Sequence, residues 1–154
     1  MIITILDYIF MIGAVGILIS IVSFIFMMIF VKRLNPYIIL AMISVLIVTP
    51  LAGTFIPSLA RSELHEKLDS EIISVVSQRG IDKAKVLHSL KDMSSAKYNN
   101  THPLERFMFK VKTAEEEIYL ELAKDSNDNE VYWVYYPKYY YSGINDVGKI
   151  KLSK

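Results

Sequence analysis

The chain has 154 residues and a nearly balanced charge, with 17 Lys and Arg side chains against 16 Asp and Glu side chains. Removing Asp7, Lys32 and Arg33 leaves 15 basic and 15 acidic residues in positions 58–154, so no strong basic field exists that would favour a nucleic acid as partner. The absence of cysteine excludes disulfides, thiolate catalysis and cysteine-based metal centres.

Two long apolar runs occupy the first third of the chain. Residues 8–31 contain no charged side chain and, as a helix, would reach about 36 Å, more than a bilayer core of about 30 Å requires. A second uncharged run follows the short basic turn at residues 32–36. We therefore predict a transmembrane helical hairpin in residues 1–57, with spans at about 8–31 and 37–57. Because Asp7 is the one charge before the first run, this start is typical of a retained anchor and not of a signal peptide.

The positions of basic residues suggest an orientation for this hairpin. Lys32 and Arg33 in the turn favour a cytoplasmic turn under the positive-inside rule, although Arg61 and Lys67 after the second run nearly balance them. The expected location is therefore a cell inner membrane, multi-pass, with the C-terminal domain extracytoplasmic, in the periplasm. The alternative places this domain in the cytosol.

Small residues predict where the two helices pack. Lipid supplies no hydrophobic drive between helices, so close backbone approach through small side chains becomes important. We expect the helix-packing face to contain Gly13, Gly16, Ser20 and Ser23 on the first helix and Ala41, Ser44 and Ala52 on the second. Such faces also permit a homo-oligomer.

Residues 58–154 are expected to form a soluble α+β domain. Leu64, Leu68, Ile72 and Val76 recur every four residues, which predicts a helix beginning near Ser58 or Ser62 and ending at Gly80. A second helix is predicted from an N-cap at Asp82 to about residue 94.

Beyond residue 103 the apolar period changes to two, which indicates strands at residues 107–112, 118–122 and 131–136. A last short pair of strands is expected at residues 139–141 and 149–152. Two helices followed by these strands predict helices packed on one face of an antiparallel sheet.

Motifs that would support catalysis or metal binding are weak in this sequence. His65, His88 and His102 lack the i, i+4 spacing that places two imidazoles on one metal. Residues 125–130 begin like a calcium loop, but Glu130 stands where such loops need glycine, which favours a hairpin turn. Glycine-rich phosphate loops and a Gly-x-Ser-x-Gly elbow are absent. We therefore expect no catalytic residues, no metal site and no cofactor, and a protein that is not an enzyme.

The most unusual feature of the sequence is a cluster of aromatic residues near its end. Large rigid side chains left at a surface can anchor protein interfaces or stack on sugars. The candidate partner-binding residues are Tyr132, Tyr136, Tyr139, Tyr140 and Tyr141. The simpler alternative is a tyrosine-rich sheet face without a partner.

Together these patterns predict a small membrane-anchored protein whose extracytoplasmic domain binds another protein. It would serve as an accessory subunit of a membrane complex or as an immunity or exclusion protein. One alternative is an envelope enzyme or ligand-binding module acting on cell-wall or lipid material. Another is the same domain facing the cytosol as an assembly or signalling platform.

Overall fold

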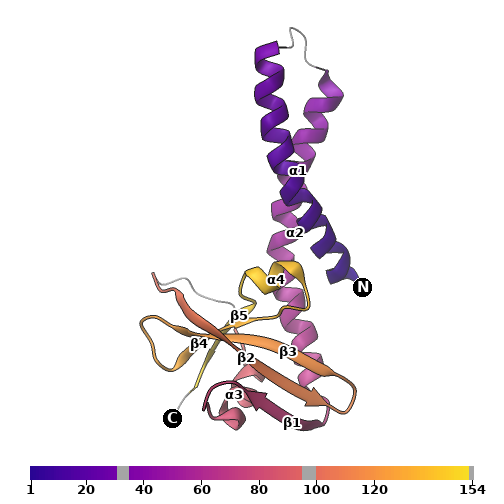
Figure 1. Ribbon diagram of the computed structural model, residues 1–154. Helices are drawn as coiled ribbons and strands as arrows, with labels where there is room; N and C mark the ends of the chain where they lie inside the picture. Colours follow the sequence, from indigo (N-terminus) through magenta and orange to yellow (C-terminus); the bar gives the residue numbers. More distant parts are fainter. Residues whose placement is uncertain (31–34, 95–99, 153–154) are drawn as a thin grey trace. The chain divides into compact units, whose positions relative to one another are not determined.

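The computed structural model describes residues 1–30, 35–94 and 100–152, and the chain divides into two compact units, Met1–Ile56 and Pro57–Lys154. The expected basic turn at residues 32–34 lies outside the described residues. The architecture is a hairpin of two long apolar helices followed by a small domain with an antiparallel sheet (Figure 1). This confirms the predicted α+β class.

The first unit consists of helix α1, Ile2–Phe30, and most of helix α2, Pro36–Leu68. Asn35 begins α2, since its side-chain oxygen accepts a hydrogen bond from the Tyr37 amide at 2.9 Å, and Pro36 occupies the first helical position, where no amide donor is needed. Both helices are long and apolar enough to cross a membrane. They indicate membrane association.

The second unit is built on a five-stranded antiparallel sheet whose strands lie side by side in chain order. The strands are β1 Ile72–Ser77, β2 Pro103–Thr113, β3 Glu117–Asp125, β4 Val131–Tyr135 and β5 Gly148–Lys151. Helix α3, Lys83–Lys91, lies between β1 and β2 in the chain, and the short helix α4, Tyr140–Ile144, lies between β4 and β5.

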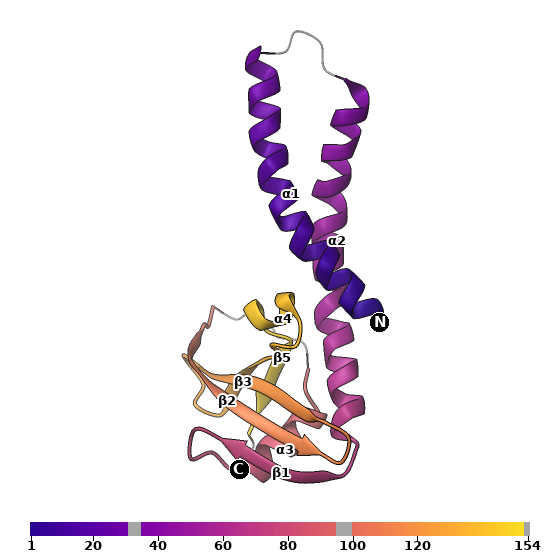
Figure 2. The ribbon, with the colours of Figure 1, turned by 45° about the vertical axis from the view of Figure 1, so that its right-hand side comes forward.

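One face of the sheet, here called the inner face, is covered by α3 and by the part of α2 that belongs to this unit (Figures 1 and 2). Alternation along the strands sends every second side chain to this face. The fully buried core contains Leu64 and Leu68 of α2, Val86 and Leu90 of α3, and Phe109, Val111, Leu120, Leu122 and Val134 of the sheet. Burial of this apolar surface is the main source of the domain's stability.

The predicted helix over residues 58–80 is wrong in its second half. Helix α2 runs without interruption through the predicted boundary at residue 57 and ends at Leu68, and strand β1 begins at Ile72. Ile72, Ile73, Val75 and Val76 are all β-branched, which favours an extended backbone and pairing with β2. The four-residue spacing from Leu64 to Val76 was therefore coincidental beyond Leu68.

The other predicted elements are present with somewhat different bounds, except the strand predicted at residues 139–141, which is absent. Asp82 caps α3 by accepting from the amides of Ala84 and Lys85, as predicted, and β2, β3 and β4 occupy the three expected strand positions. Residues 139–141 do not form a strand. Tyr139 is the N-cap of α4, and Tyr140 and Tyr141 are its first two residues. The Ser142 hydroxyl donates to the Tyr136 carbonyl and the Tyr136 amide donates to the Ser142 carbonyl, which closes a tight loop here.

Candidate functional site

The five candidate tyrosines do not all lie together in the structure. Tyr136 and Tyr139 are buried, Tyr132 and Tyr141 are half-buried, and Tyr140 is exposed. Tyr132 lies on β4, Tyr136 follows that strand, and the other three lie at or inside α4. They do not form one continuous aromatic surface, so each must be placed by its own contacts.

Tyr136 and Tyr139 belong to a polar cluster around Glu63 of α2. The Tyr136 hydroxyl donates to Glu63 Oε1 at 3.3 Å, the Tyr139 hydroxyl donates to Oε2, and Lys138 Nζ lies 2.5 Å from Oε1. The two tyrosine rings meet edge to face with centroids 5.8 Å apart. These side chains therefore hold the segment after β4 to α2, and their hydroxyl groups are used inside the domain.

The charge of Glu63 is stabilised by this cluster. Burial alone would raise the pKa of the Glu63 carboxyl, but hydrogen bonds from Lys138 and Tyr139 and the positive charges of Lys138 and Lys67 lower it below its usual value. The Tyr136 pKa is raised by burial, and the neighbouring Glu63 charge raises it further. Glu63 is therefore ionised and Tyr136 neutral near pH 7, as their hydrogen bond requires.

Tyr135 and Trp133 point to the opposite face of the sheet, here called the outer face, where they are also buried. The Arg106 guanidinium lies over the Tyr135 ring, 3.5 Å from its centroid. It also donates to the carbonyl oxygens of Gly143 at 2.7 Å and Ile144 at 2.9 Å. Arg106 thus joins the end of α4 to the outer face and covers the part of that face formed by β4.

Asp125 at the end of β3 organises the turn into β4. Its Oδ1 accepts from the Asn127 amide at 3.0 Å, and its Oδ2 accepts from Trp133 Nε1 at 2.9 Å and from Lys149 Nζ at 3.3 Å. Burial would raise the pKa of the Asp125 carboxyl, but these donors hold it well below its usual range. Its oxygens are thus occupied by donors of the domain itself, in the hairpin turn that the sequence favoured.

Strands β1, β2 and β3 leave their part of the outer face open. Val76, Met108 and Tyr119 are 58%, 41% and 48% exposed, respectively. Val76 and Tyr119 are both register partners of Lys110, and Met108 is the partner of Glu121. The three apolar side chains therefore lie around Lys110 on three neighbouring strands, with Met108 one outward position from Lys110 along β2. We call Val76, Met108 and Tyr119 the open patch.

Charged neighbours fix the position of Tyr119 within this patch. The Tyr119 hydroxyl donates to Glu117 Oε2 at 2.8 Å, and Lys110 Nζ lies 2.5 Å from the same carboxylate and 4.8 Å from the ring centroid. These hydrogen bonds, that of Lys110 first, lower the pKa of the Glu117 carboxyl. Tyr119 is thus an exposed aromatic side chain already held in one position, which reduces the entropy lost when a partner binds.

A groove of about 350 Å³ runs beside the open patch. Its lining includes Gln78, Arg106, Met108, Tyr119, Glu121 and Pro137. Arg106 and Glu121 form an ion pair at 3.3 Å, so the groove combines apolar surface with paired charges. Tyr and Arg are the residue types most enriched at energetically dominant positions of protein interfaces.

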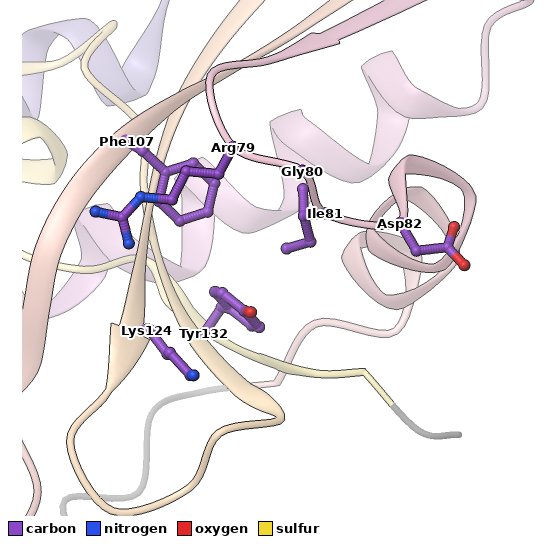
Figure 3. A pocket seen from close by; sticks show the side chains of 7 residues that line it. All are labelled: Arg79, Gly80, Ile81, Asp82, Phe107, Lys124 and Tyr132. Atoms are coloured by element: carbon purple, nitrogen blue, oxygen red, sulfur yellow. The ribbon is translucent and has the colours of Figure 1, made fainter.

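A second cavity, of about 380 Å³, lies on the inner face at the end that the helices leave uncovered (Figure 3). It is lined by Arg79, Gly80, Ile81 and Asp82 of the β1–α3 connection and by Phe107, Lys124 and Tyr132 of the sheet. Phe107 and Tyr132 meet edge to face with centroids 6.2 Å apart. Of the five candidate tyrosines, Tyr132 is the one that lines this cavity.

The predicted helix-packing residues of the first unit have different environments. A Cβ atom at Gly13 would collide with the side chain of Thr49, and one at Gly16 would lie 3.2 Å from Val45 Cγ1, so both glycines allow close approach of α2. Ser20 and Ser23 are half-buried and Ala52 is buried, whereas Ala41 and Ser44 are exposed. On α2 the residues that face the two glycines are Thr49 and Val45. The sequence prediction missed both, because it was based on Gly, Ala and Ser.

Metal-binding groups of three or more His, Cys, Asp or Glu side chains do not occur among the described residues.

Comparison with known proteins found no match: the chain matches no known protein family, no curated protein and no solved structure.

The open patch was not selected in the sequence, although a signal for it was present. The predicted strand at residues 118–122 alternates Ile118, Leu120 and Leu122 with Tyr119 and Glu121, which already places Tyr119 on the polar face. An aromatic residue on that face is the unusual observation.

Proposed function

We propose that this chain is a small membrane-anchored protein of a cell inner membrane, whose domain lies on the extracytoplasmic side and binds another protein through the open patch. The role is that of an accessory subunit of a membrane complex or of an immunity or exclusion protein. In this proposal the protein acts by binding and not by catalysis.

The observation that carries the proposal is the contrast between the two parts of the outer face. Over β4, Arg106 covers the ring of Tyr135 and Lys149 covers the ring of Trp133, and both rings are buried. Over β1–β3, three large apolar side chains stay exposed next to a groove. A domain that covers one half of a sheet face and leaves apolar side chains on the other has a surface suited to a partner. The edge of β1 next to the patch adds a strand that a partner could extend.

The orientation rests on the sequence. Lys32 and Arg33 lie within the short connection between the apolar helices, which favours a cytoplasmic connection and an extracytoplasmic domain. A reporter fused after Lys154 that is active on one side of the membrane tests this directly. Activity restricted to the cytoplasmic side would replace the proposed location with the cytosolic platform described above.

The binding proposal is tested by affinity purification of the full-length protein in mild detergent from cells that contain its partner. Met108→Lys and Tyr119→Lys each place a charge in the open patch, and Ile144→Lys makes the same change at an exposed site on α4. We expect both patch variants to reduce recovery of the partner by about tenfold or more, as for an energetically dominant interface residue, and the α4 variant to retain it. Equal recovery with all three variants would exclude the open patch as the binding surface.

A ligand-binding module is the second candidate function, and the cavity of Figure 3 favours it. Its volume of about 380 Å³ lies in the range of about 300–1,000 Å³ typical of small-molecule sites, and it combines aromatic and cationic side chains.

A further inference from the structure

We propose that the inner-face cavity binds a carboxylate carried on an aromatic or aliphatic group, with Lys124 and Tyr132 holding the carboxylate and Phe107 contacting the apolar part. The source of such a group is either a small organic acid or the free C-terminus of a peptide. This site is on the opposite side of the sheet from the open patch, so it goes beyond the proposed function and does not depend on it.

The cavity exists because the cover of the inner face stops short of the sheet's end. Phe107 is the register partner of Leu122, and Lys124 is the partner of Tyr132, one inward position further along β3. Leu122 is fully buried, whereas Lys124 and Tyr132 are half-buried. The β1–α3 connection, residues 79–82, forms a rim beyond α3 in place of a packed helix. A recess with a sheet floor and a loop wall results.

Two polar groups in this recess have no hydrogen-bond or ion-pair partner among the described residues. Neither Lys124 Nζ nor the Tyr132 hydroxyl forms a hydrogen bond or ion pair with another described residue, although both line the cavity. The Asp82 carboxylate on the rim is used elsewhere, since it accepts from the Ala84 and Lys85 amides at 3.1 and 3.2 Å. Figure 3 shows it directed away from the two aromatic rings. An anion entering the recess would thus meet the Lys124 ammonium and the Tyr132 hydroxyl as donors. The Asp82 carboxylate would not compete with the anion for these two donors.

The aromatic side chains of the recess favour an apolar group as the part of the ligand that carries the carboxylate. The Arg79 guanidinium lies 5.1 Å from the Phe107 centroid and covers one side of that ring (Figure 3). Arg79 also pairs with Glu105 at 2.5 Å, so the Arg79 charge is already balanced. The Tyr132 ring meets Phe107 edge to face, and Ile81 adds an aliphatic side chain to the lining. A planar or branched apolar group can fill the space between them and gain contact area with these side chains.

The charge of the recess selects a monoanion. Arg79 is already paired with Glu105, and Asp82 is used as the cap of α3, so Lys124 is the cation left to neutralise a ligand. A carboxylate matches one ammonium and one hydroxyl donor, whereas a phosphate dianion would need further donors. This balance is the reason for proposing a carboxylate.

The test uses the full-length protein in lipid nanodiscs and isothermal titration calorimetry with N-acetyl-L-phenylalanine, with empty nanodiscs as the blank. The matched uncharged probe is N-acetyl-L-phenylalanine amide. We expect saturable binding of the acid and binding of the amide weaker by about tenfold or more, because a charge-assisted hydrogen bond is lost. Absence of saturable binding, or equal binding of acid and amide, would overturn the proposal.

Variants locate the site. Lys124→Met removes the ammonium while keeping the length of the side chain, and Tyr132→Phe removes the hydroxyl. Lys112→Met, at an exposed outward position of β2, is the matched control. We expect the two cavity variants to weaken binding of the acid, Lys124→Met by about tenfold, and the control to bind as the unchanged protein does. Because both changes are at partly solvated positions, thermal unfolding should stay unchanged, and a folded Lys124→Met variant with normal affinity would refute the site.

A peptide arm distinguishes the two sources of the carboxylate. N-acetyl-Ala-Ala-Ala-Phe carries the same terminal group on an extended chain. Tighter binding of this peptide than of N-acetyl-L-phenylalanine would identify a peptide C-terminus as the ligand. Equal or weaker binding of the peptide would identify a small organic acid.

Discussion

The two units of this chain are rich in the same apolar residue types and place them in opposite ways. In α1 one residue, Ile3, is buried among 29, and large side chains such as Leu18, Val22 and Ile29 are about two-thirds exposed. In the second unit Phe109, Leu120 and Leu122 are completely buried against helices. Exposed apolar surface on this scale indicates membrane association of the hairpin, whereas the domain supplies its own apolar interior.

The units also differ in how they treat charge. No charged residue occurs in α1 after Asp7 or in the part of α2 before Arg61. The domain instead buries Asp125 and partly buries Glu63, each surrounded by donors of its own. A buried charge is tolerated where several hydrogen bonds replace water.

Phe109→Ala should destabilise the domain by about 3–5 kcal/mol, because a fully buried side chain is lost and a cavity remains. Leu18→Ala in α1 should change domain stability by less than about 0.5 kcal/mol, because that side chain is 66% exposed. Fluorescence of Trp133 during denaturant unfolding in micelles measures this, since the chain contains one tryptophan and it lies in the domain. Similar losses from both variants would mean that the hairpin and the domain share one core.

Asp125→Asn should destabilise the domain by about 3 kcal/mol, because the charged hydrogen bonds to Trp133 and Lys149 are lost or weakened. The pKa of Asp125 is lower in the folded than in the unfolded state, so the unfolded chain takes up this proton first as the pH falls. The contribution is therefore complete above about pH 5 and is lost as the pH falls below about 4.

Unfolding of the Asp125→Asn variant between pH 7 and pH 3 measures both effects. The variant should lose less stability than the unchanged protein over this range, since the group that titrates is gone. Asp128→Asn, which removes a carboxylate paired with Lys151 at a more exposed position, is the control and should have a small effect. An unaltered pH profile in Asp125→Asn would contradict the assigned role.

Gly13→Leu should separate the helices of the first unit, because the new side chain would overlap Thr49; overpacking of this kind costs about 1–3 kcal/mol. Because the chain lacks cysteine, a Gly16→Cys/Val45→Cys pair can report the distance through the yield of oxidative cross-linking. We expect a lower yield in the Gly13→Leu background. Val15→Leu, at an exposed position of the same turn, should leave the yield unchanged.

Tyr139→Phe should destabilise the domain by about 1 kcal/mol, because the Glu63 carboxylate loses one donor in a partly buried cluster. Tyr119→Phe removes the same hydroxyl from an exposed ring, and its effect on stability should be smaller. Thermal unfolding compares the two variants. If Tyr139→Phe were neutral while Tyr119→Phe was costly, the assignment of Tyr139 to the interior and Tyr119 to the surface would be reversed.

Local patterns in the sequence were sufficient for the features that depend on a few neighbouring residues. The apolar runs, the N-cap at Asp82 and the alternation through residues 107–122 each reflect backbone geometry that operates over one or two turns or a single strand. These features gave the α+β class and the hairpin. The prediction from local patterns was wrong at Ile72, because the four-residue apolar spacing of the helix continued by chance into the strand that begins there.

Which aromatic and polar side chains are used inside the molecule depends on its tertiary contacts. Composition near the end of the chain could not reveal that Tyr136 and Tyr139 are bound to Glu63, 73 and 76 residues away in the chain, or that Tyr119 remains exposed. The apolar character of the first third was predictable from the sequence, because hydropathy is a sum over neighbouring residues. Burial of a given tyrosine depends on which distant segments fold over it, and no local pattern carries that information.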